Sequence, residues 1–146
     1  MTEVLIKRLS KNIELPKYET NGSSGMDLSA NIEKQIKIEP GKTSIIPTGI
    51  SVSIPKNFEI QIRSRSGLAA KSQISVLNSP GTIDADYRGE LKVILINLSN
   101  KTFVVEKGTR IAQMVLCPII KAKFKEVDNL DDTIRGDGGF GSTGLK

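Results

Sequence analysis

The sequence predicts an all-β fold, namely a sandwich, jelly roll or barrel, with one short helical turn and a flexible, Gly-rich C-terminal tail. About a dozen short apolar runs follow one another at close spacing, and several alternate apolar and polar residues with the two-residue period of a strand. One segment alone has a helical pattern. Five of the nine residues at 136–144 are Gly, so this stretch cannot form a packed element by itself.

Length and composition indicate one globular domain that covers residues 1–146. The chain has no internal repeat and no linker-like stretch that would separate a second domain. Aromatic residues make up 4% of the chain and Trp is absent, which predicts an aliphatic core. No apolar run is long enough to span a bilayer, no signal or transit peptide is visible, and a single Cys cannot form an internal disulfide. We therefore expect a cytoplasmic protein without a membrane partner.

The first half of the chain is predicted to form a series of strands. Residues 4–9 alternate loosely and suit an edge strand. Residues 26–30 follow a turn, and Asp27 should point away from its two apolar neighbours. Further strands are expected at 36–38, 43–46, 50–54 and 59–63, with Pro40, Gly41, Pro47, Gly49 and Pro55 between them.

The segment at 63–71 interrupts this strand pattern. Serines followed by Leu-Ala-Ala-Lys are typical of the N-cap of a short helix. The free N–H groups of a helix start, together with Arg65 and Ser66, can bind an anion. A capped helical turn that only joins two strands explains the segment equally well.

A β-hairpin is predicted at 79–93. Two acids, Asp84 and Asp86, lie near its tip beside Tyr87 and an Arg, and Asn78 stands just before it. The backbone of a hairpin can line a ligand while a carboxylate lies at its end. A polar loop with solvated charges is the alternative.

Two later segments are strongly apolar. Residues 91–97 are apolar on both faces toward their end and suit a central strand. Residues 110–120 form the longest apolar run, which Gln113 interrupts. A buried Gln without partners costs about 1–3 kcal/mol, so this side chain should bond to backbone or face a site.

The residue types that are missing narrow the chemistry. The chain has no His, and Cys117 lies in an apolar run that suits a buried, unreactive thiol. A zinc site of the Cys/His kind is excluded, acid–base chemistry must use carboxylates, and any metal should be a hard cation such as Mg²⁺. The net charge of +5 suits nucleic acid or a small polyanion, although the basic residues are scattered and aromatic stacking residues are few.

The predicted mobile segment covers about residues 133–146. A disordered tail is one interpretation. The other is a segment that closes over a ligand, in which the Arg and hydroxyl groups bind phosphate and the aromatic ring stacks on a base.

Five segments together span essentially the whole chain: GMDL at 25–28, RSGLA at 65–69, GTIDADYRG at 81–89, RIAQM at 110–114 and RGDGGFGSTG at 135–144. In this order they resemble the five motifs of the homotrimeric dUTP pyrophosphatases. One departure is Ser64, where Pro or Gly is common in the family.

The resemblance implies a jelly-roll homotrimer with three active sites, each built from more than one subunit. The implied reaction is the hydrolysis of dUTP to dUMP and pyrophosphate by attack of water on the α-phosphorus. Mg²⁺ is then held by the triphosphate and not directly by the protein. The implied partners are dUTP and the other subunits, with no nucleic acid.

The resemblance also implies roles for individual residues. Asp84 resembles the general base, and Tyr87 resembles the ring that packs under the deoxyribose and leaves no room for a 2′-hydroxyl. Asp27 resembles an acid that supports the metal-bound waters or the tail. The other matched residues are Asn78 and the backbone of Thr82, Ile83 and Lys92 for the uracil; Arg65, Ser66, Gly67 and Gln113 for the phosphates; and Arg135, Phe140, Ser142 and Thr143 in the closing tail, with Phe140 over the uracil.

Two alternatives differ in chemistry. A dCTP deaminase of the same superfamily is usually longer and lacks the Gly-rich tail with Phe. A regulatory protein that binds dUTP and signals to a partner would not need Asp84 for that role.

Overall fold

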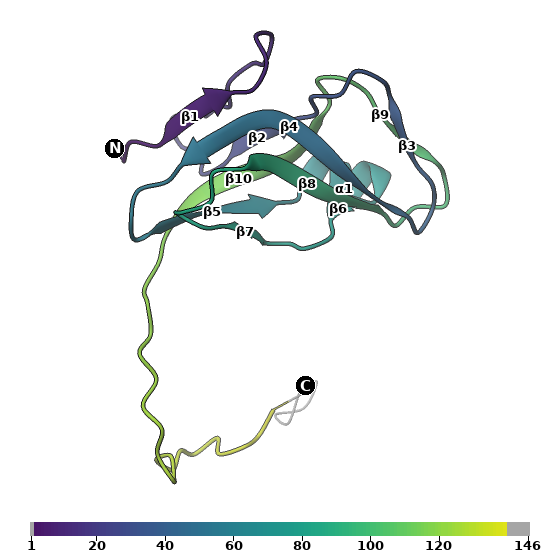
Figure 1. The fold of residues 1–146 in the computed structure, drawn as a ribbon. Coiled ribbons are helices and arrows are strands. Elements are labelled where there is room, and N and C mark those ends of the chain that lie inside the picture. The colour runs from purple at the N-terminus through teal and green to yellow at the C-terminus, as the bar shows by residue number, and fades with distance from the viewer. Residues whose placement is uncertain (1, 140–146) are drawn as a thin grey trace.

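In the computed structural model, which describes residues 2–139, two four-stranded antiparallel sheets pack face to face (Figure 1). The β4 sheet has the strand order β1-β4-β8-β6, the β10 sheet has the order β2-β10-β5-β7, and β3 pairs with β9. This arrangement confirms the all-β, jelly-roll-like fold. The elements are β1 (Leu5–Arg8), β2 (Met26–Ser29), β3 (Ile36–Ile38), β4 (Thr43–Ser53), β5 (Phe58–Arg63), α1 (Ser66–Ser72), β6 (Ile74–Val76), β7 (Gly81–Ile83), β8 (Glu90–Asn97), β9 (Phe103–Val105) and β10 (Arg110–Pro118).

The core between the sheets is aliphatic, as the composition predicts. Ile46 and Leu95 of the β4 sheet and Leu28 and Ile60 of the β10 sheet belong to one buried cluster. Buried residues alternate with more exposed ones along β5 and β8, as expected of strands with one face on a core. The outward face of the β10 sheet is therefore free to carry polar side chains, including Asp27 on β2.

The predicted edge strand and central strand are both confirmed. β1 lies at the edge of the β4 sheet, and β8 lies between β4 and β6. On the outward face of β8, however, Ile94 and Ile96 are only partly buried. The chain itself thus leaves an apolar sheet face incompletely covered.

The predicted break between strands at 43–46 and 50–54 is wrong, because both segments belong to β4. The pairing of β4 with β8 shifts register between Pro47 and Ser51, which marks a β-bulge or similar irregularity. Gly49 has a φ of +71°, a conformation that Gly adopts without strain. Pro47 and Gly49 thus reshape a continuous strand and do not end it.

The helix at Ser66–Ser72 is confirmed, but the prediction that a serine caps it is wrong. The N-cap is Arg65, which is extended with φ −85° and ψ 127° and makes no side-chain cap hydrogen bond. Ser64 Oγ instead accepts a hydrogen bond from the Val76 N–H at 2.9 Å and so ties the helix start to β6. Within the described residues, no helix is of a length and hydropathy that would cross a membrane.

The predicted hairpin at 79–93 is wrong in one respect, because β7 and β8 do not pair with each other. β7 pairs with β5, whereas β8 pairs with β4 and β6. The loop at 84–89 therefore carries the chain from one sheet to the other. Among the described residues, part of the edge of β7 and part of the edge of β8 beside this loop therefore have no paired strand.

Cys117 is partly exposed, so the expectation of a buried thiol is wrong. Its side chain lies on the same side of β10 as that of Gln113, because the two residues are four positions apart and side chains at even separations along a strand share a face. Its Sγ lies 3.7 Å from Nη2 of Arg63.

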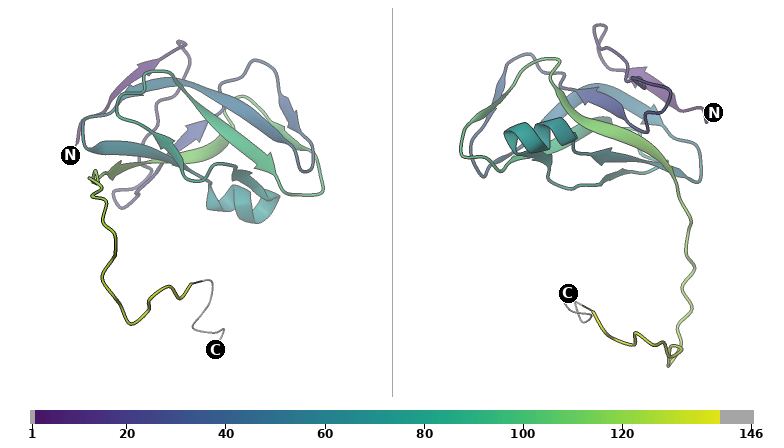
Figure 2. Two further views of the ribbon diagram at one scale, coloured as in Figure 1. Left: turned by 60° about the horizontal axis from the view of Figure 1, so that its bottom comes forward. Right: turned by 180° about the vertical axis from the view of Figure 1, so that it is seen from behind.

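Residues 119–139 leave the end of β10 and run away from the sandwich in every view (Figures 1 and 2). They contain no helix or strand. Large apolar side chains are exposed along this segment, namely Ile120, Phe124, Val127, Leu130 and Ile134.

Candidate active site

A cavity of about 270 Å³ opens between β7 and β8. It lies where the two strands separate, so strand edges and the loop at 84–89 form its walls. Five of the residues predicted to act on the substrate line it, together with one acid that had no predicted role. The lining residues are Thr82, Ile83, Asp84, Tyr87, Glu90 and Lys92.

Backbone groups of β8 face this cavity. Ile94 accepts a hydrogen bond at its C=O from the Leu77 N–H at 2.8 Å, on the side of β8 where β6 lies. Because backbone polar groups of alternate residues point to the same edge of a strand, the N–H and C=O of Lys92 point to that side as well. β6 has already ended there, so these groups of Lys92 are positioned to bind a ligand.

Hydrogen bonds within the loop at 84–89 fix its shape. The Tyr87 N–H donates to the C=O of Asp84 at 3.1 Å and closes a turn. Arg88 Nη1 donates to the C=O of Ala85 at 2.7 Å and to that of Tyr87 at 2.9 Å. The Tyr87 hydroxyl donates to the C=O of Glu90 at 3.1 Å, so the ring is tied to the start of β8.

Asn78 lies beside the cavity and is not part of its lining. It is exposed, and its Nδ2 would lie 3.2 Å from a Cβ added to Gly81, the first residue of β7. The Ile62 Cβ would lie 3.4 Å from the same added atom. Gly81 thus allows the Asn78 side chain to approach the strand closely.

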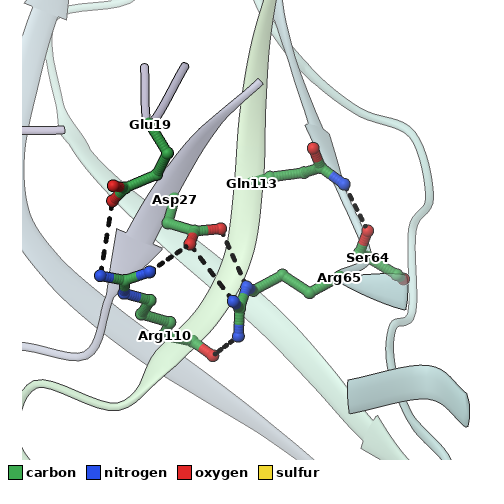
Figure 3. Close-up of polar contacts among 6 residues, drawn as sticks. All are labelled: Glu19, Asp27, Ser64, Arg65, Arg110 and Gln113. Atoms are coloured by element: carbon green, nitrogen blue, oxygen red, sulfur yellow. Dashed lines mark hydrogen bonds and ion pairs between the residues drawn. The ribbon is translucent and has the colours of Figure 1, made fainter. Parts of the chain in front are cut away.

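A second group of predicted residues surrounds Asp27 (Figure 3). Arg65 donates from Nε to Asp27 Oδ1 at 2.8 Å and from Nη2 to Oδ2 at 3.2 Å. Arg110 donates from Nη1 to Asp27 Oδ2 at 3.2 Å, and its Nη2 lies 3.4 Å from Glu19 Oε1. Arg65 Nη1 also donates to the Arg110 C=O at 3.3 Å. Asp27 therefore holds two cationic side chains from different elements side by side.

Gln113 adjoins this group on β10. It lies directly opposite Asp27 on β2 and Arg63 on β5. Its Nε2 donates to the Ser64 C=O at 3.0 Å. The prediction that this Gln needs a backbone partner or a site is confirmed by the backbone bond, which also attaches it to the segment that leads into α1 (Figure 3).

Arg65, Ser66 and Gly67 form the start of α1 next to Asp27. Ser66 and Gly67 are exposed, and the helix has no side-chain cap among the described residues. The first N–H groups of a helix that lacks such a cap remain available to an anion. The structure thus brings Asp27, Arg65, Ser66, Gly67 and Gln113 together in what we call the Asp27–Arg65 cluster.

The cavity and the Asp27–Arg65 cluster lie apart within one chain. β2, which carries Asp27, and β7, which precedes Asp84, form opposite edges of the β10 sheet, with β10 and β5 between them. Three strand spacings of about 4.8 Å separate these edges by roughly 14 Å. Asp84 lies farther along the sheet as well, because Ile83 is opposite Ile60 whereas Gln113 is opposite Arg63.

Of the predicted tail residues, the structure describes Arg135, which is not part of either group. Arg135 lies in the segment that runs away from the sandwich, where its Nε donates to the Gly138 C=O at 2.8 Å. Phe140, Ser142 and Thr143 lie outside the described residues.

The charged side chains do not form a metal site made of protein ligands alone. Within residues 2–139, no group of three or more His, Cys, Asp or Glu could hold an ion. Both oxygens of Asp27 accept hydrogen bonds from arginines. The residues present fit Mg²⁺ where most of its ligands are phosphate oxygens and water, which is the usual form of nucleotide sites.

Comparison with known proteins places the chain in a family. A sequence model described as dUTPase matches residues 11–144. The chain belongs to the dUTPase family. The deoxyuridine 5′-triphosphate nucleotidohydrolase of Rickettsia bellii (strain OSU 85-389) is 56% identical and covers 99% of this chain and 97% of its own length. That of Ehrlichia canis (strain Jake) is 54% identical over 99% of this chain and 97% of its own length.

A solved dUTPase has the same architecture. A variant of the enzyme from Staphylococcus bacteriophage 80alpha, determined with dUpNHpp, has a TM-score of 0.88 and 27% identity to this chain. The match covers 99% of this chain and 100% of the phage protein. The predicted membership of the dUTPase family and the predicted fold class are thereby confirmed.

Three residues of this dUTPase-family chain hold the two sites in place but had no predicted role. They are Glu19, Glu90 and Arg110. Arg110 was part of a recognised motif, but a register shift between Arg110 and Ala112 determines which way β10 presents it. Such a shift has no signal in the alternation of the sequence. Glu90 directly follows the motif that ends at Gly89. Its supporting role is visible only from the hydrogen bond that it accepts from Gly49 of β4.

Proposed function

We propose that the chain hydrolyses dUTP to dUMP and pyrophosphate, with Asp84 as the general base. The observation that carries the proposal is the position of the Asp84 carboxylate, at the end of β7 and in the lining of the cavity between β7 and β8. Water attacks the α-phosphorus and gives its proton to Asp84. The bond from the α-phosphorus to the oxygen that bridges to the β-phosphate breaks, and its electron pair leaves with pyrophosphate.

The cavity suits a uracil ring. The backbone N–H and C=O of Lys92, with the backbone groups of β7 at Thr82 or Ile83 that point away from β5, can pair with the polar edge of the base. A cytosine reverses donor and acceptor at two positions, N3 and the 4-substituent, and leaving buried polar groups mismatched is costly. A 5-methyl group, as in thymine, would press against strand backbone.

Tyr87 is proposed to select the sugar. Its ring lines the cavity next to Asp84 and is held by the hydroxyl bond to Glu90. Packed under a deoxyribose, the ring leaves no room for a 2′-hydroxyl. Ribonucleotides would then be rejected by contact with the ring.

The Asp27–Arg65 cluster is proposed to bind the phosphates. Arg65, the free N–H groups of Ser66 and Gly67, and the Gln113 amide supply donors that suit phosphate oxygens. Asp27 holds Arg65 in place and supports either the metal-bound waters or the tail. When bound with the triphosphate, Mg²⁺ supplies further neutralisation of charge at the phosphates.

We further propose that the enzyme is a homotrimer in which one subunit supplies the cavity and another supplies the Asp27–Arg65 cluster. The separation of the two groups within one chain supports this, because one nucleotide must touch both. Since phosphoryl transfer depends on positioning and on charge neutralisation, neither group suffices alone.

An uncovered apolar face also supports assembly. On the outward side of the β4 sheet, Ile45 is 60% exposed and lies opposite the partly buried Ile94, and Leu77 on the adjacent β6 edge is 52% exposed. Lys92 lies on the same side of β8, two residues before Ile94. A second copy packed on this face would therefore lie next to the cavity.

The tail is proposed to close over the bound nucleotide. Arg135 and the hydroxyl groups of Ser142 and Thr143 would bind phosphate, and Phe140 would stack on the uracil. The segment at 119–139 runs away from the sandwich and would carry the tail toward a neighbouring subunit (Figure 1).

Asp84→Asn tests the proposed reaction, with Asp86→Asn as the matched control in the same loop. The Asn variant keeps the size of the side chain but cannot accept the proton. We expect dUTP to bind with little change, while turnover falls by about 10²–10⁴-fold, the usual contribution of a general base. Unchanged turnover would remove Asp84 from the mechanism.

The alternatives make different predictions. A dCTP deaminase is not favoured by the family match or by the names of the relatives, and it would release ammonia from dCTP. If the chain is a regulatory protein, the wild type and Asp84→Asn would bind dUTP with the same affinity, and neither would release pyrophosphate.

A further inference from the structure

Glu90 connects the cavity to the body of the fold. It is the first residue of β8 and lines the cavity with Asp84 and Tyr87. Its side chain is 24% exposed, and its Oε1 accepts a hydrogen bond from the Gly49 N–H at 2.8 Å. The Glu90 carboxylate therefore fixes the start of β8 to the irregular part of β4.

The partner of Glu90 is a rigid point in the structure. Gly49 is buried, has a φ of +71°, and accepts a hydrogen bond at its C=O from the Leu9 N–H at 2.8 Å. A Cβ added at Gly49 would collide with the side chains of Ile13 and Asn31. Because this segment is so closely surrounded, a bond to it holds Glu90 in one position.

Glu90 also holds Tyr87. The Tyr87 hydroxyl donates to the C=O of Glu90 at 3.1 Å, and the Tyr87 residue is 44% exposed. A ring that is this exposed is not fixed by burial, so its hydroxyl bond contributes much of what determines its position. One residue thus bonds to β4 with its side chain and to Tyr87 with its backbone.

From this geometry we infer that Glu90 is a positioning residue for sugar selectivity, acting through Tyr87. The inference rests on the proposed function, in which the Tyr87 ring excludes a 2′-hydroxyl. A ring can exclude one oxygen atom only if its position varies little. The start of β8 is also held by the register of Glu90 with Ser51 and by the Thr48 hydroxyl on the Leu91 C=O. Loss of the Glu90 side-chain bond therefore loosens this end of β8 without detaching it, the acceptor for Tyr87 shifts, and the ring gives way to a ribose.

A purely structural role for Glu90 predicts something different. Glu90→Ala leaves the buried Gly49 N–H without its partner, which reduces stability. A less stable protein has fewer active molecules, and this lowers the rates with dUTP and UTP by the same factor. The ratio of kcat/KM for dUTP to kcat/KM for UTP is independent of the active fraction, and so it reports on selectivity alone.

The experiment measures this ratio for the wild type, E90A, E90Q and Y87F. E90Q keeps a carbonyl oxygen that can accept from Gly49. Y87F keeps the ring and loses only the hydroxyl bond. We expect the ratio to fall by about tenfold in E90A and in Y87F, the effect of losing about 1.4 kcal/mol of discrimination, and to stay near the wild-type value in E90Q.

An unchanged ratio in E90A would overturn the inference while leaving dUTP hydrolysis intact. If E90A does not fold, Y87F decides, because Tyr87 is exposed and its hydroxyl makes one hydrogen bond within residues 2–139. An unchanged ratio in Y87F would also overturn the inference. A wild-type chain that releases no pyrophosphate from dUTP would overturn the proposed function, and the inference with it.

Discussion

The guanidinium of Arg65 bonds to both carboxylate oxygens of Asp27, from Nε to Oδ1 at 2.8 Å and from Nη2 to Oδ2 at 3.2 Å. This pair connects the start of α1 to β2. Arg110 bonds to the same carboxylate from β10. Arg110 also lies 3.4 Å from Glu19, so two carboxylates balance the two arginines, and phosphate binding would depend on the directed N–H groups of Arg65 and of the helix start.

Asp27→Asn should impair catalysis more than stability. The Asp27 and Arg65 side chains are 23% and 31% exposed, so their ion pair contributes at most about 1 kcal/mol to stability. Without the carboxylate, Arg65 and Arg110 repel each other and Arg65 leaves the phosphate site. We expect kcat/KM for dUTP to fall about tenfold in steady-state assays. Asp86→Asn serves as the control, and an unaltered kcat/KM in the Asp27 variant would contradict this role.

Gly25→Ala tests the position of Gln113. A Cβ at residue 25 would collide with the Gln113 Oε1 and lie 3.3 Å from its Cδ. The end of a flexible side chain can move, so the free energy of unfolding should change by less than about 1 kcal/mol. Activity should fall about tenfold because the amide is displaced from Ser64 and from the proposed phosphate site. Gly22→Ala is the matched control, since nothing lies within 4 Å of an added Cβ there. Equal activity of the two variants would argue against a role for Gln113.

Ile45→Lys should prevent assembly. A charge placed on the apolar outward face of the β4 sheet cannot be buried against another subunit without a large desolvation penalty. We expect sedimentation velocity to show a monomer that retains its β-sheet circular dichroism spectrum and has lost activity. Val104→Lys introduces the same charge at a 38% exposed position on β9 and should leave the assembly intact. An Ile45→Lys protein of wild-type mass would show that this face is not an interface.

Mixing two inactive variants tests whether active sites are shared between subunits. Asp84→Asn lacks the proposed base, and Arg65→Ala lacks the arginine proposed to bind phosphate. If each site takes Asp84 from one subunit and Arg65 from another, random mixed trimers regain about one quarter of the wild-type activity, because half of the subunits supply each intact half-site. A mixture in which one partner carries both substitutions should stay inactive. No recovery after complete subunit exchange would place both residues in the same chain's site.

The strand pattern was largely predictable because it depends on local sequence. Alternation along 59–63 and the apolar run at 91–97 identify β5 and β8, and five residues that were named from the family resemblance line the cavity. The pairing of strands was harder to predict. Nothing near residues 79–93 indicates that β5 takes the free edge of β7, or that β8 lies between β4 and β6.

The supporting residues were not predictable, for a related reason. Glu90 and Gly49 are 41 positions apart in sequence, and Arg110 and Asp27 are 83 apart. Their contacts depend on irregular strand positions, and an irregularity changes the direction of a side chain without changing the apolar pattern. The sequence shows which residues could carry the chemistry, whereas only the fold shows which residues hold them in place.

Pyrophosphate release by the wild-type chain in the presence of Mg²⁺, measured side by side with dUTP, dCTP, dTTP and UTP, tests the proposed reaction most directly. We expect rapid release from dUTP and very slow release from the other three, because the cavity is proposed to select the base and Tyr87 is proposed to select the sugar. Release of ammonia from dCTP, or binding of dUTP without any release of pyrophosphate, would contradict the proposed function.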